Sequence, residues 1–278
     1  MDFPIRETVE KRHSVRTYES RPLSEADKKA LLRYRDGVTN PFGVPATIHF
    51  IETESSDQPK KLGTYGVIKG AGSFLGVVVP QDQLGLEAAG YAMEQLVLYA
   101  THLGLGTCWL AATLNREAFT KEMHTREDEW MPAISPIGYP AEKRSLQERM
   151  MRSSMKSSQR KPWSELFFHD DCCTPITEAE AGEYTEALHL LRLAPSATNA
   201  QPWRVVMDDE AFHFYAVMGK DANTENPAAI QRVDVGIGAC HFHLAAQEKG
   251  LPGRFERRES RIPGAPEGWR YLFSWVRE

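Results

Sequence analysis

Three residues near the start of the chain alternate in a pattern that could bind an anion. Arg12, Ser14 and Arg16 stand in the run R-H-S-V-R, between an amphipathic stretch at 5–11 and an extended Thr17-Tyr18. On an extended backbone, alternate side chains point to the same side. Guanidinium groups bind phosphate oxygens in pairs, and a hydroxyl donates to a third oxygen. The run therefore predicts a site for a phosphate monoester, with a solvated basic turn as the competing interpretation.

A second run of interest lies in the last third of the chain. Residues 194–204 read A-P-S-A-T-N-A-Q-P-W-R and lead into Val205-Val206, which is typical of a strand. The Pro-Ser pair indicates a turn, and the small side chains allow the backbone to approach a ligand closely. We expect Gln201 to be structural and Trp203 to anchor the loop by packing.

The elements that must position these two runs recur along the chain. Stretches beginning at Pro22 and Pro175 each have the form of a helix start, with Ser24 or Thr177 as the N-cap and an acid three residues later. A loop and then a strand follow in both cases, at 48–51 and at 204–207. The sequence thus contains two similar units in the same order.

Two long apolar helices strengthen this repeat. They are predicted at 88–103 and 235–249, and each is followed by a glycine, as expected at a helix C-terminus. We infer an internal duplication, with chance recurrence of a common unit as the alternative. A buried strand at 134–137 and an irregular, basic connector at 153–161 join the halves. The predicted domains are 1–155 and 156–278, intertwined as one unit.

Composition narrows the class of protein. The chain is 41% hydrophobic and 26% charged, which is typical of a globular protein, and its net charge of −5 does not favour nucleic-acid binding. No apolar run is long enough to span a membrane, and the first residues lack the pattern of a signal peptide. The four cysteines lack zinc spacing, so we expect reduced thiols in a cytoplasmic protein.

Other catalytic or metal-binding patterns are weak. His241-x-His243 could suggest a metal, but the two side chains point in different directions on a helix, so one in solvent and one in the core is the favoured reading. No Ser-His-Asp arrangement, paired-carboxylate site or Walker-type loop is apparent. We therefore predict no metal, no nucleic-acid partner and no catalytic side chain of these kinds.

The two runs resemble a known family. R-H-S-V-R-T-Y followed by P-L-S-E-A-D resembles the N-terminal signature of the nitroreductase family, whose members bind FMN, and residues 194–203 resemble its second signature. Residues 91–110 are similar to its central helix, and 137–142 with 160–162 to its closing segment. The resemblance covers most of the chain. It implies an α+β fold with a mixed, mostly antiparallel sheet between helices.

The order of the signatures departs from the usual pattern. In ordinary members they lie about one helix apart, and a homodimer builds each FMN site from the first signature of one subunit and the second signature of the other. Here residues 37–43 replace the loop in the first half, and residues 163–168 replace the Arg/Ser run in the second. The chain resembles the tandem-repeat subgroup of the family. This implies a pseudo-dimer with one composite flavin site, and a monomer or weak homodimer.

The resemblance also implies which residues contact FMN. In chain order they are Arg12, His13, Ser14, Arg16, Lys69, Trp109, Leu110, Ala111, Ala112, Arg160, Pro195, Ser196, Ala197 and Asn199. The Arg/Ser run would hold the phosphate, with Arg160 or Lys161 closing over it. The 195–199 loop would present backbone donors and the Asn199 amide to the ring.

Two further roles concern the flavin ring itself. Ala111 and Ala112 would donate backbone N–H groups near N5, because alanine has nothing else to donate. Lys69 would stabilise negative charge at N1 and O2 of the reduced ring, with a plain surface lysine as the alternative.

The expected function is that of an FMN-dependent NAD(P)H oxidoreductase of nitroreductase type. NADH or NADPH would reduce the flavin in a ping-pong reaction, and a small organic acceptor such as a nitroaromatic or quinone-like compound would reoxidise it. Two alternatives stay open. The same fold could carry another FMN reaction (dehalogenation, flavin fragmentation or dehydrogenation), or the protein could bind flavin without catalysis.

Overall fold

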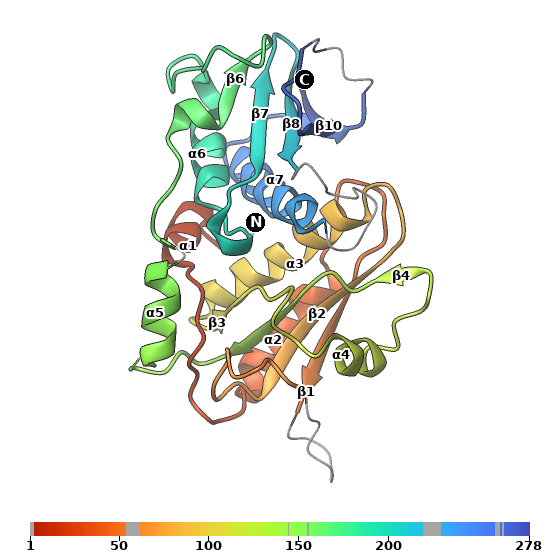
Figure 1. Cartoon of the computed structure of the whole chain (residues 1–278), viewed down its shortest axis with the longest axis vertical. Coiled ribbons are helices and arrows are strands. Elements are labelled where there is room, and N and C mark those ends of the chain that lie inside the picture. Colours follow the sequence, from red (N-terminus) through yellow and green to blue (C-terminus); the bar gives the residue numbers. More distant parts are fainter. Residues whose placement is uncertain are drawn as a thin grey trace.

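The chain folds into two β-sheets at opposite ends of the molecule, with two long helices crossing between them (Figure 1). The computed structural model describes residues 3–53, 62–143, 145–154, 156–218, 229–258, 262 and 264–278. The helices are α1 Ile5–Lys11, α2 Glu25–Asp36, α3 Gly85–His102, α4 Arg116–Glu122, α5 Leu146–Ser154, α6 Thr185–Leu193 and α7 Ile230–Glu248. Short 3₁₀ turns lie at Trp163–Glu165, Gly182–Tyr184 and Ala197–Asn199.

The strands repeat one arrangement twice. The first sheet contains β1 Thr47–Glu52, β2 Ser73–Pro80, β3 Gly106–Thr107, β4 Glu129–Trp130 and β5 Ile134–Gly138. The second contains β6 Phe167–His169, β7 Trp203–Met207, β8 Ala211–Val217, β9 Gly253–Glu256 and β10 Trp269–Arg277. Their orders are β1-β2-β5-β3, with β4 on β2, and β6-β7-β8-β10-β9. Without β4 and β6, the two orders are the same, as an internal duplication requires.

All strand neighbours are antiparallel except β6 and β7. The result is the mixed, mostly antiparallel α+β architecture that the resemblance implied. The strands predicted at 48–51, 134–137 and 204–207 are confirmed as β1, β5 and β7.

The ends of the two central helices repeat in detail. Gly104 and Gly250, just past α3 and α7, both have left-handed backbones, with φ of +78° and +67°. In both halves the residue after the glycine donates its N–H to a carbonyl of the last helical turn at 2.9 Å. This is the glycine-dependent helix stop that the sequence predicted.

The helices α3 and α7 pack against each other at two glycines. A Cβ at Gly90 would lie 2.1 Å from the carbonyl oxygen of Val233, and a Cβ at Gly236 would lie 2.2 Å from that of Glu87. Each glycine therefore lies directly on the backbone of the opposite helix. The contact is reciprocal, as a pseudo-twofold axis between the halves demands.

A buried ion pair joins the same two helices. Arg232 donates from Nε to Oε1 of Glu87 at 2.6 Å and from Nη2 to Oε2 at 2.7 Å. The arginine side chain is 2% exposed and the glutamate side chain 0%. A bidentate pair in a dry interface tolerates little misalignment, because losing one partner strands a buried charge.

The N-terminal helix α1 packs on the second half. Ile5 N donates to Glu248 Oε1 of α7 at 3.0 Å, and Arg6 Nε donates to Glu186 Oε1 of α6 at 2.6 Å. Figure 1 shows α1 beside α6, away from the first sheet. The chain therefore passes from the second half to the first over the residues that follow α1.

Two sequence expectations need correction. Thr177 does form a reciprocal capping pair with Glu180, with N–H donations of 2.6 and 3.2 Å, but it closes an isolated turn, and α6 begins only at Thr185. The connector was expected to be irregular, yet α5 ends within it at Ser154. The capping signal at Thr177 and the composition of the connector were therefore poor guides to where a helix begins or ends.

Within the described residues, none of the helices is both long and apolar enough to cross a membrane.

The glycine contact gives a stability prediction. Gly90→Ala should destabilise the fold by about 3 kcal/mol or more, because its methyl group would overlap a backbone carbonyl that cannot move alone. The matched control is Gly238→Ala on α7, whose Cβ would meet Leu191 and Trp203 at ordinary distances of 3.5 and 3.6 Å. The control should stay within about 1 kcal/mol of the parent, since alanine also favours the helix. Urea unfolding measures both, and equal losses would contradict the close crossing.

Candidate functional site

The Arg/Ser run forms an extended segment held on both sides. Ser14 pairs with Thr107 in a parallel bridge, and Thr17 pairs with Lys69 in another. Lys69 N also donates to Arg16 O at 2.9 Å. The predicted alternation is therefore present, and the structure brings Lys69 and the start of the 107–112 segment to the same run.

The 194–201 loop has an unusual backbone. Thr198, Asn199 and Gln201 have left-handed conformations, with φ of +51°, +59° and +49°. Residues other than glycine adopt this region infrequently, and it costs energy unless the surroundings impose it. Ser196 Oγ accepts from Gln201 N at 2.9 Å, and the buried Asp234 of α7 accepts from Ala197 N at 3.1 and 3.2 Å. Such strain concentrates at ligand sites.

Arg160 interacts with residues of both signatures. Its Nη1 donates to Asn199 Oδ1 at 3.4 Å, and its Nη2 donates to Leu193 O at 3.0 Å. Burial, and then repulsion by Arg12 and Arg192, lower the pKa of Arg160 to about 10. This repulsion acts through space and indicates that Arg12 lies in the neighbourhood of Arg160, which itself bonds to the second loop. That the first run and the second loop form one site stays a prediction.

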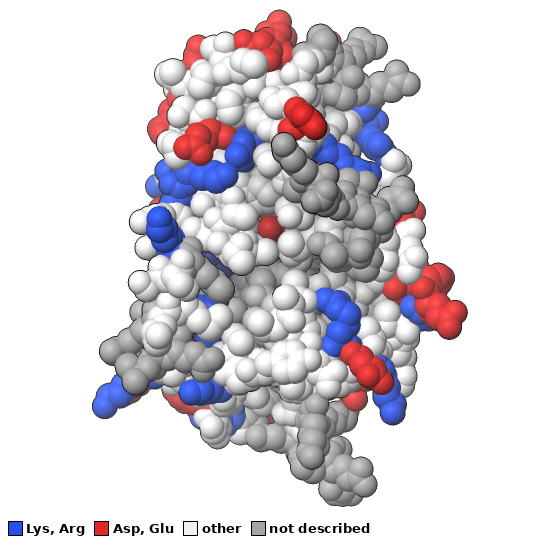
Figure 2. Space-filling model, in the orientation of Figure 1, with Lys and Arg blue, Asp and Glu red and all other residues white. Residues whose placement is uncertain are grey.

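The charges of these basic residues suit an anion. Arg16 is only 8% exposed, and the Nε of Arg160 is buried without a hydrogen-bond partner in the part of the chain that the structure describes. On the face drawn in Figure 2, basic side chains gather in several separate groups, with acidic side chains beside them. A buried guanidinium N–H without a partner is costly unless an anion accepts from it. The residues present therefore fit a phosphate group.

The Asn199 side chain bonds to the connector, and its expected contact with the flavin ring stays a prediction. Its Nδ2 donates to Lys156 O at 2.9 Å and to Gln159 O at 3.0 Å, while its Oδ1 accepts from Arg160. The amide thus ties the loop to the connector, and the loop can also offer a ligand its backbone. Gln201 is structural as predicted, because its Oε1 accepts from Lys161 N at 2.8 Å.

Trp203 is fully buried and lies over Gly238 of α7, which confirms it as a packing anchor. Pro195 and Ser196, ahead of the left-handed residues, are half-buried. His13 is exposed, and its ring nitrogen Nδ1 lies 3.0 Å from Lys11 O.

The 109–112 segment leaves the first sheet beside the Arg/Ser run. Leu110 is buried and bridges Ile134 of β5, Ala111 is half-buried and Ala112 is exposed. Trp109 donates its indole N–H to the fully buried Glu94 of α3 at 2.7 Å. The segment is therefore held by its first residues, Ala111 packs at the edge of the core, and Ala112 is exposed.

The two histidines of α7 point in different directions, as expected. His241 is fully buried against Glu94, whereas the Nδ1 of His243 lies 2.6 Å from the hydroxyl of Tyr91. The expectation that one of them faces solvent was wrong: His243 lies in an aromatic cluster, where burial lowers its pKa to about 4. The reason is that α7 is covered by both halves. Among the described residues, no group of three side chains could hold a metal ion.

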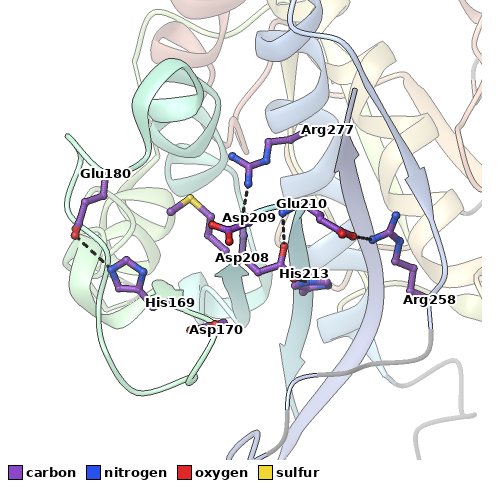
Figure 3. Close-up of a pocket in the computed structure, with 10 residues that line it drawn as sticks. His169, Asp170, Glu180, Asp208, Asp209, Glu210, His213, Arg258 and Arg277 are labelled. Atoms are coloured by element: carbon purple, nitrogen blue, oxygen red, sulfur yellow. Dashed lines mark hydrogen bonds and ion pairs between the residues drawn. The ribbon is translucent and has the colours of Figure 1, made fainter.

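A large cleft lies elsewhere, at the β7–β8 turn of the second sheet (Figure 3). It measures about 1130 Å³ and is lined mainly by charged side chains. Within it Asp208 Oδ2 lies 2.9 Å from His213 Nε2, and His213 Nδ1 lies 2.7 Å from Ser274 Oγ. Ser274 is fully buried, so the arrangement offers no accessible nucleophile. Neither the Arg/Ser run nor the 195–199 loop lines this cleft.

Sequence reasoning missed two buried acids, Asp234 and Glu94. His241, also fully buried, was expected only as one of two histidines of which one lies in the core. Asp234 lies within an otherwise apolar stretch of α7, and burial raises its pKa to about 8. An acid inside an apolar helix was the available signal, and its partner on a distant loop was not visible in the sequence.

Comparison with known proteins places these features in a family. The family model described as "Putative TM nitroreductase" matches residues 4–246. A search of curated proteins found no match.

The chain is also similar to solved structures. A protein from Thermotoga maritima described as a putative nitroreductase is 20% identical with a TM-score of 0.63, over 99% of this chain and 94% of that one. A nitroreductase family protein from Clostridium difficile is 20% identical with a TM-score of 0.44, over 59% and 96%. A nitroreductase with bound FMN from Bacteroides fragilis is 20% identical with a TM-score of 0.41, over 52% and 92%. The first of these shows the fold over both halves.

The buried carboxyl of Asp234 predicts a dependence of stability on pH. Its pKa of about 8 in the fold exceeds the value of about 3.9 for an unfolded chain, so the folded state binds the proton more tightly. Stability contributed by this group is therefore complete below about pH 4 and is lost as the pH rises towards 8. Asp234→Asn keeps an acceptor for Ala197 N and removes the ionisation.

The variant should be more stable than the parent at about pH 8, with the difference shrinking towards pH 5. Urea unfolding at the two pH values measures it, with the exposed Asp209→Asn as the control. Parallel pH profiles for parent and Asp234→Asn would show that Asp234 does not carry the effect.

Proposed function

Because this chain belongs to the TM nitroreductase family, we propose that it is an FMN-dependent oxidoreductase. It would take electrons from NADH or NADPH and pass them to a small organic acceptor of nitroaromatic or quinone-like type. The observation that supports this most is the position of Arg160, which bonds to Asn199 of the 195–199 loop and is repelled by Arg12 of the Arg/Ser run. One composite site, assembled from both halves, suits a single flavin.

The side chains divide the work of binding. Arg12, Ser14 and Arg16 bind the phosphate, and Arg160 covers it from the connector. The negative charge of the phosphate offsets the repulsion between the guanidinium groups. The buried position of Arg16 excludes water from the phosphate and strengthens that contact.

The backbone presents the remaining groups. The 195–199 loop offers N–H and carbonyl groups from the second half, and Ala111 with Ala112 offers N–H groups from the first. Lys69, exposed beside the Arg/Ser run, contributes positive charge. FMN, when bound, supplies the redox chemistry by accepting hydride from the nucleotide and passing electrons to the acceptor in a ping-pong cycle.

The test begins with the colour of the protein. The purified chain, reconstituted with FMN if needed, should show flavin absorbance, and NADH or NADPH added without oxygen should bleach it. A protein that cannot be loaded with FMN overturns the proposal. A yellow protein that neither nucleotide bleaches would instead favour the second candidate, another FMN reaction on the same fold, or flavin binding without catalysis.

The phosphate assignment predicts the effect of a double substitution. Arg12→Ala with Arg16→Ala should weaken FMN binding at least about 100-fold, because two charge-assisted contacts of about 1.5–3 kcal/mol each are lost. Fluorescence quenching of free FMN on titration with protein measures the affinity.

The matched control removes the same charge elsewhere. Arg126→Ala with Arg254→Ala changes two exposed arginines, whose side chains are 65% and 57% exposed, and should leave FMN affinity unchanged. Circular dichroism checks that both double variants fold. Retained affinity in the folded Arg12/Arg16 variant would show that the phosphate binds elsewhere.

A further inference from the structure

A buried chain of hydrogen bonds runs beneath the composite site and crosses between the halves. Trp109 Nε1 donates to Glu94 Oε2 at 2.7 Å, and Glu94 Oε1 lies 2.8 Å from His241 Nε2. The other ring nitrogen of His241, Nδ1, lies 3.1 Å from Leu190 O. Glu94 and His241 both have 0% exposure. The chain thus joins the 109–112 segment to α3, α7 and α6 through two fully buried side chains.

The donors in this chain can be assigned from chemistry alone. A carbonyl oxygen only accepts, so His241 Nδ1 carries a proton and donates to Leu190 O. An indole N–H only donates, so Glu94 Oε2 accepts from Trp109. One further proton lies between Glu94 Oε1 and His241 Nε2, on either atom. In both arrangements the pair is neutral overall, which suits its burial.

The two ends of the chain lie at the two flavin-facing segments. Trp109 opens the 109–112 segment from the first half, and Leu190 belongs to α6, which leads directly into the 194–199 loop from the second half. Nothing in the Arg/Ser run or in the sequence signatures explains a fully buried Glu-His pair at this point. The pair bonds to Trp109 on one side and to Leu190 on the other, so it links the 109–112 segment to the helix that precedes the 194–199 loop.

We propose that Glu94 and His241 are positioning residues of the flavin site, which hold the Trp109 indole and so fix the 109–112 segment relative to the loop after α6. That the ligand is a flavin rests on the proposed function. That Glu94 and His241 hold Trp109 rests on the distances given above. Glu94 is a positioning residue because it acts through Trp109 and not by touching a ligand.

The neutral arrangement singles out one substitution as conservative. In Glu94→Gln the amide oxygen can accept from Trp109 and the amide N–H can donate to His241 Nε2, while Nδ1–H stays on Leu190 O. Glu94→Leu has a similar bulk but leaves both the indole N–H and the imidazole nitrogen buried without a partner. Comparing the two variants therefore separates the effect of the hydrogen bonds from the effect of side-chain volume.

The first measurement needs no flavin. The chain has six tryptophans, and labelling with 5-fluorotryptophan gives each of them a fluorine NMR signal. The signal that disappears in Trp109→Phe is that of Trp109. Glu94→Leu should shift and broaden the Trp109 signal, and Glu94→Gln should keep it narrow. An unchanged Trp109 signal in Glu94→Leu would overturn the claim that Glu94 holds the indole.

The second measurement asks whether Glu94 acts through Trp109. Glu94→Leu and Trp109→Phe should each weaken FMN binding about tenfold, the double variant should be no weaker than the worse single one, and Glu94→Gln should stay within about threefold of the parent. Additive losses, or wild-type affinity in Trp109→Phe, would overturn the positioning role. If Glu94→Leu fails to fold, Trp109→Phe and Glu94→Gln still decide the question.

Failure of the proposed function would look different. A parent protein that binds no FMN removes the flavin from the proposal, while the fluorine signal still reports whether Glu94 fixes Trp109. A parent that binds FMN with additive losses keeps the proposed function and removes the positioning role.

Discussion

The close crossing of α3 and α7 is the contact on which the rest of the molecule depends. At Gly90 and Gly236 each helix lies directly against the backbone of the other, at distances where no side chain fits. This brings the two sheets to opposite ends and leaves their connecting loops to meet beside the crossing. A composite site from two halves needs such a rigid, reproducible alignment, because a shift of about 1 Å is enough to lose binding geometry.

Buried polar contacts refine the same alignment. The Arg232–Glu87 pair and the Glu94–His241 pair both cross between the two helices in dry surroundings. Contacts of this kind add modest net stability but penalise a wrong register heavily, since each partner would be stranded. The interface between halves is thus specified by close packing at the glycines and by polar pairs on either side. The helix α1, which belongs to the first half in sequence, packs on α6 and α7 of the second half and adds a further contact between the halves.

Much of the fold could be predicted because its signals are local. Helix periodicity, a glycine after the last turn and short apolar runs identified α3, α7, β1, β5 and β7 without tertiary information. Failures occurred where a local signal had no tertiary support. Thr177 has the chemistry of a helix cap but caps only a turn. One of His241 and His243 was expected in solvent, but His241 is buried and His243 is half-buried among aromatic rings.

For the site, the sequence by itself determined the residue types: an alternating Arg/Ser run suited to a phosphate, and a small-residue loop suited to close backbone approach. Their order along the chain, each in a different half, also indicated a composite site. Only the tertiary structure decided the contacts of these residues: Arg160 bonds to the loop, the Asn199 amide is turned to the connector, and Asp234 and Glu94 are buried. The physical reason is that hydrogen bonds and desolvation depend on distances between residues remote in sequence, which no local pattern encodes.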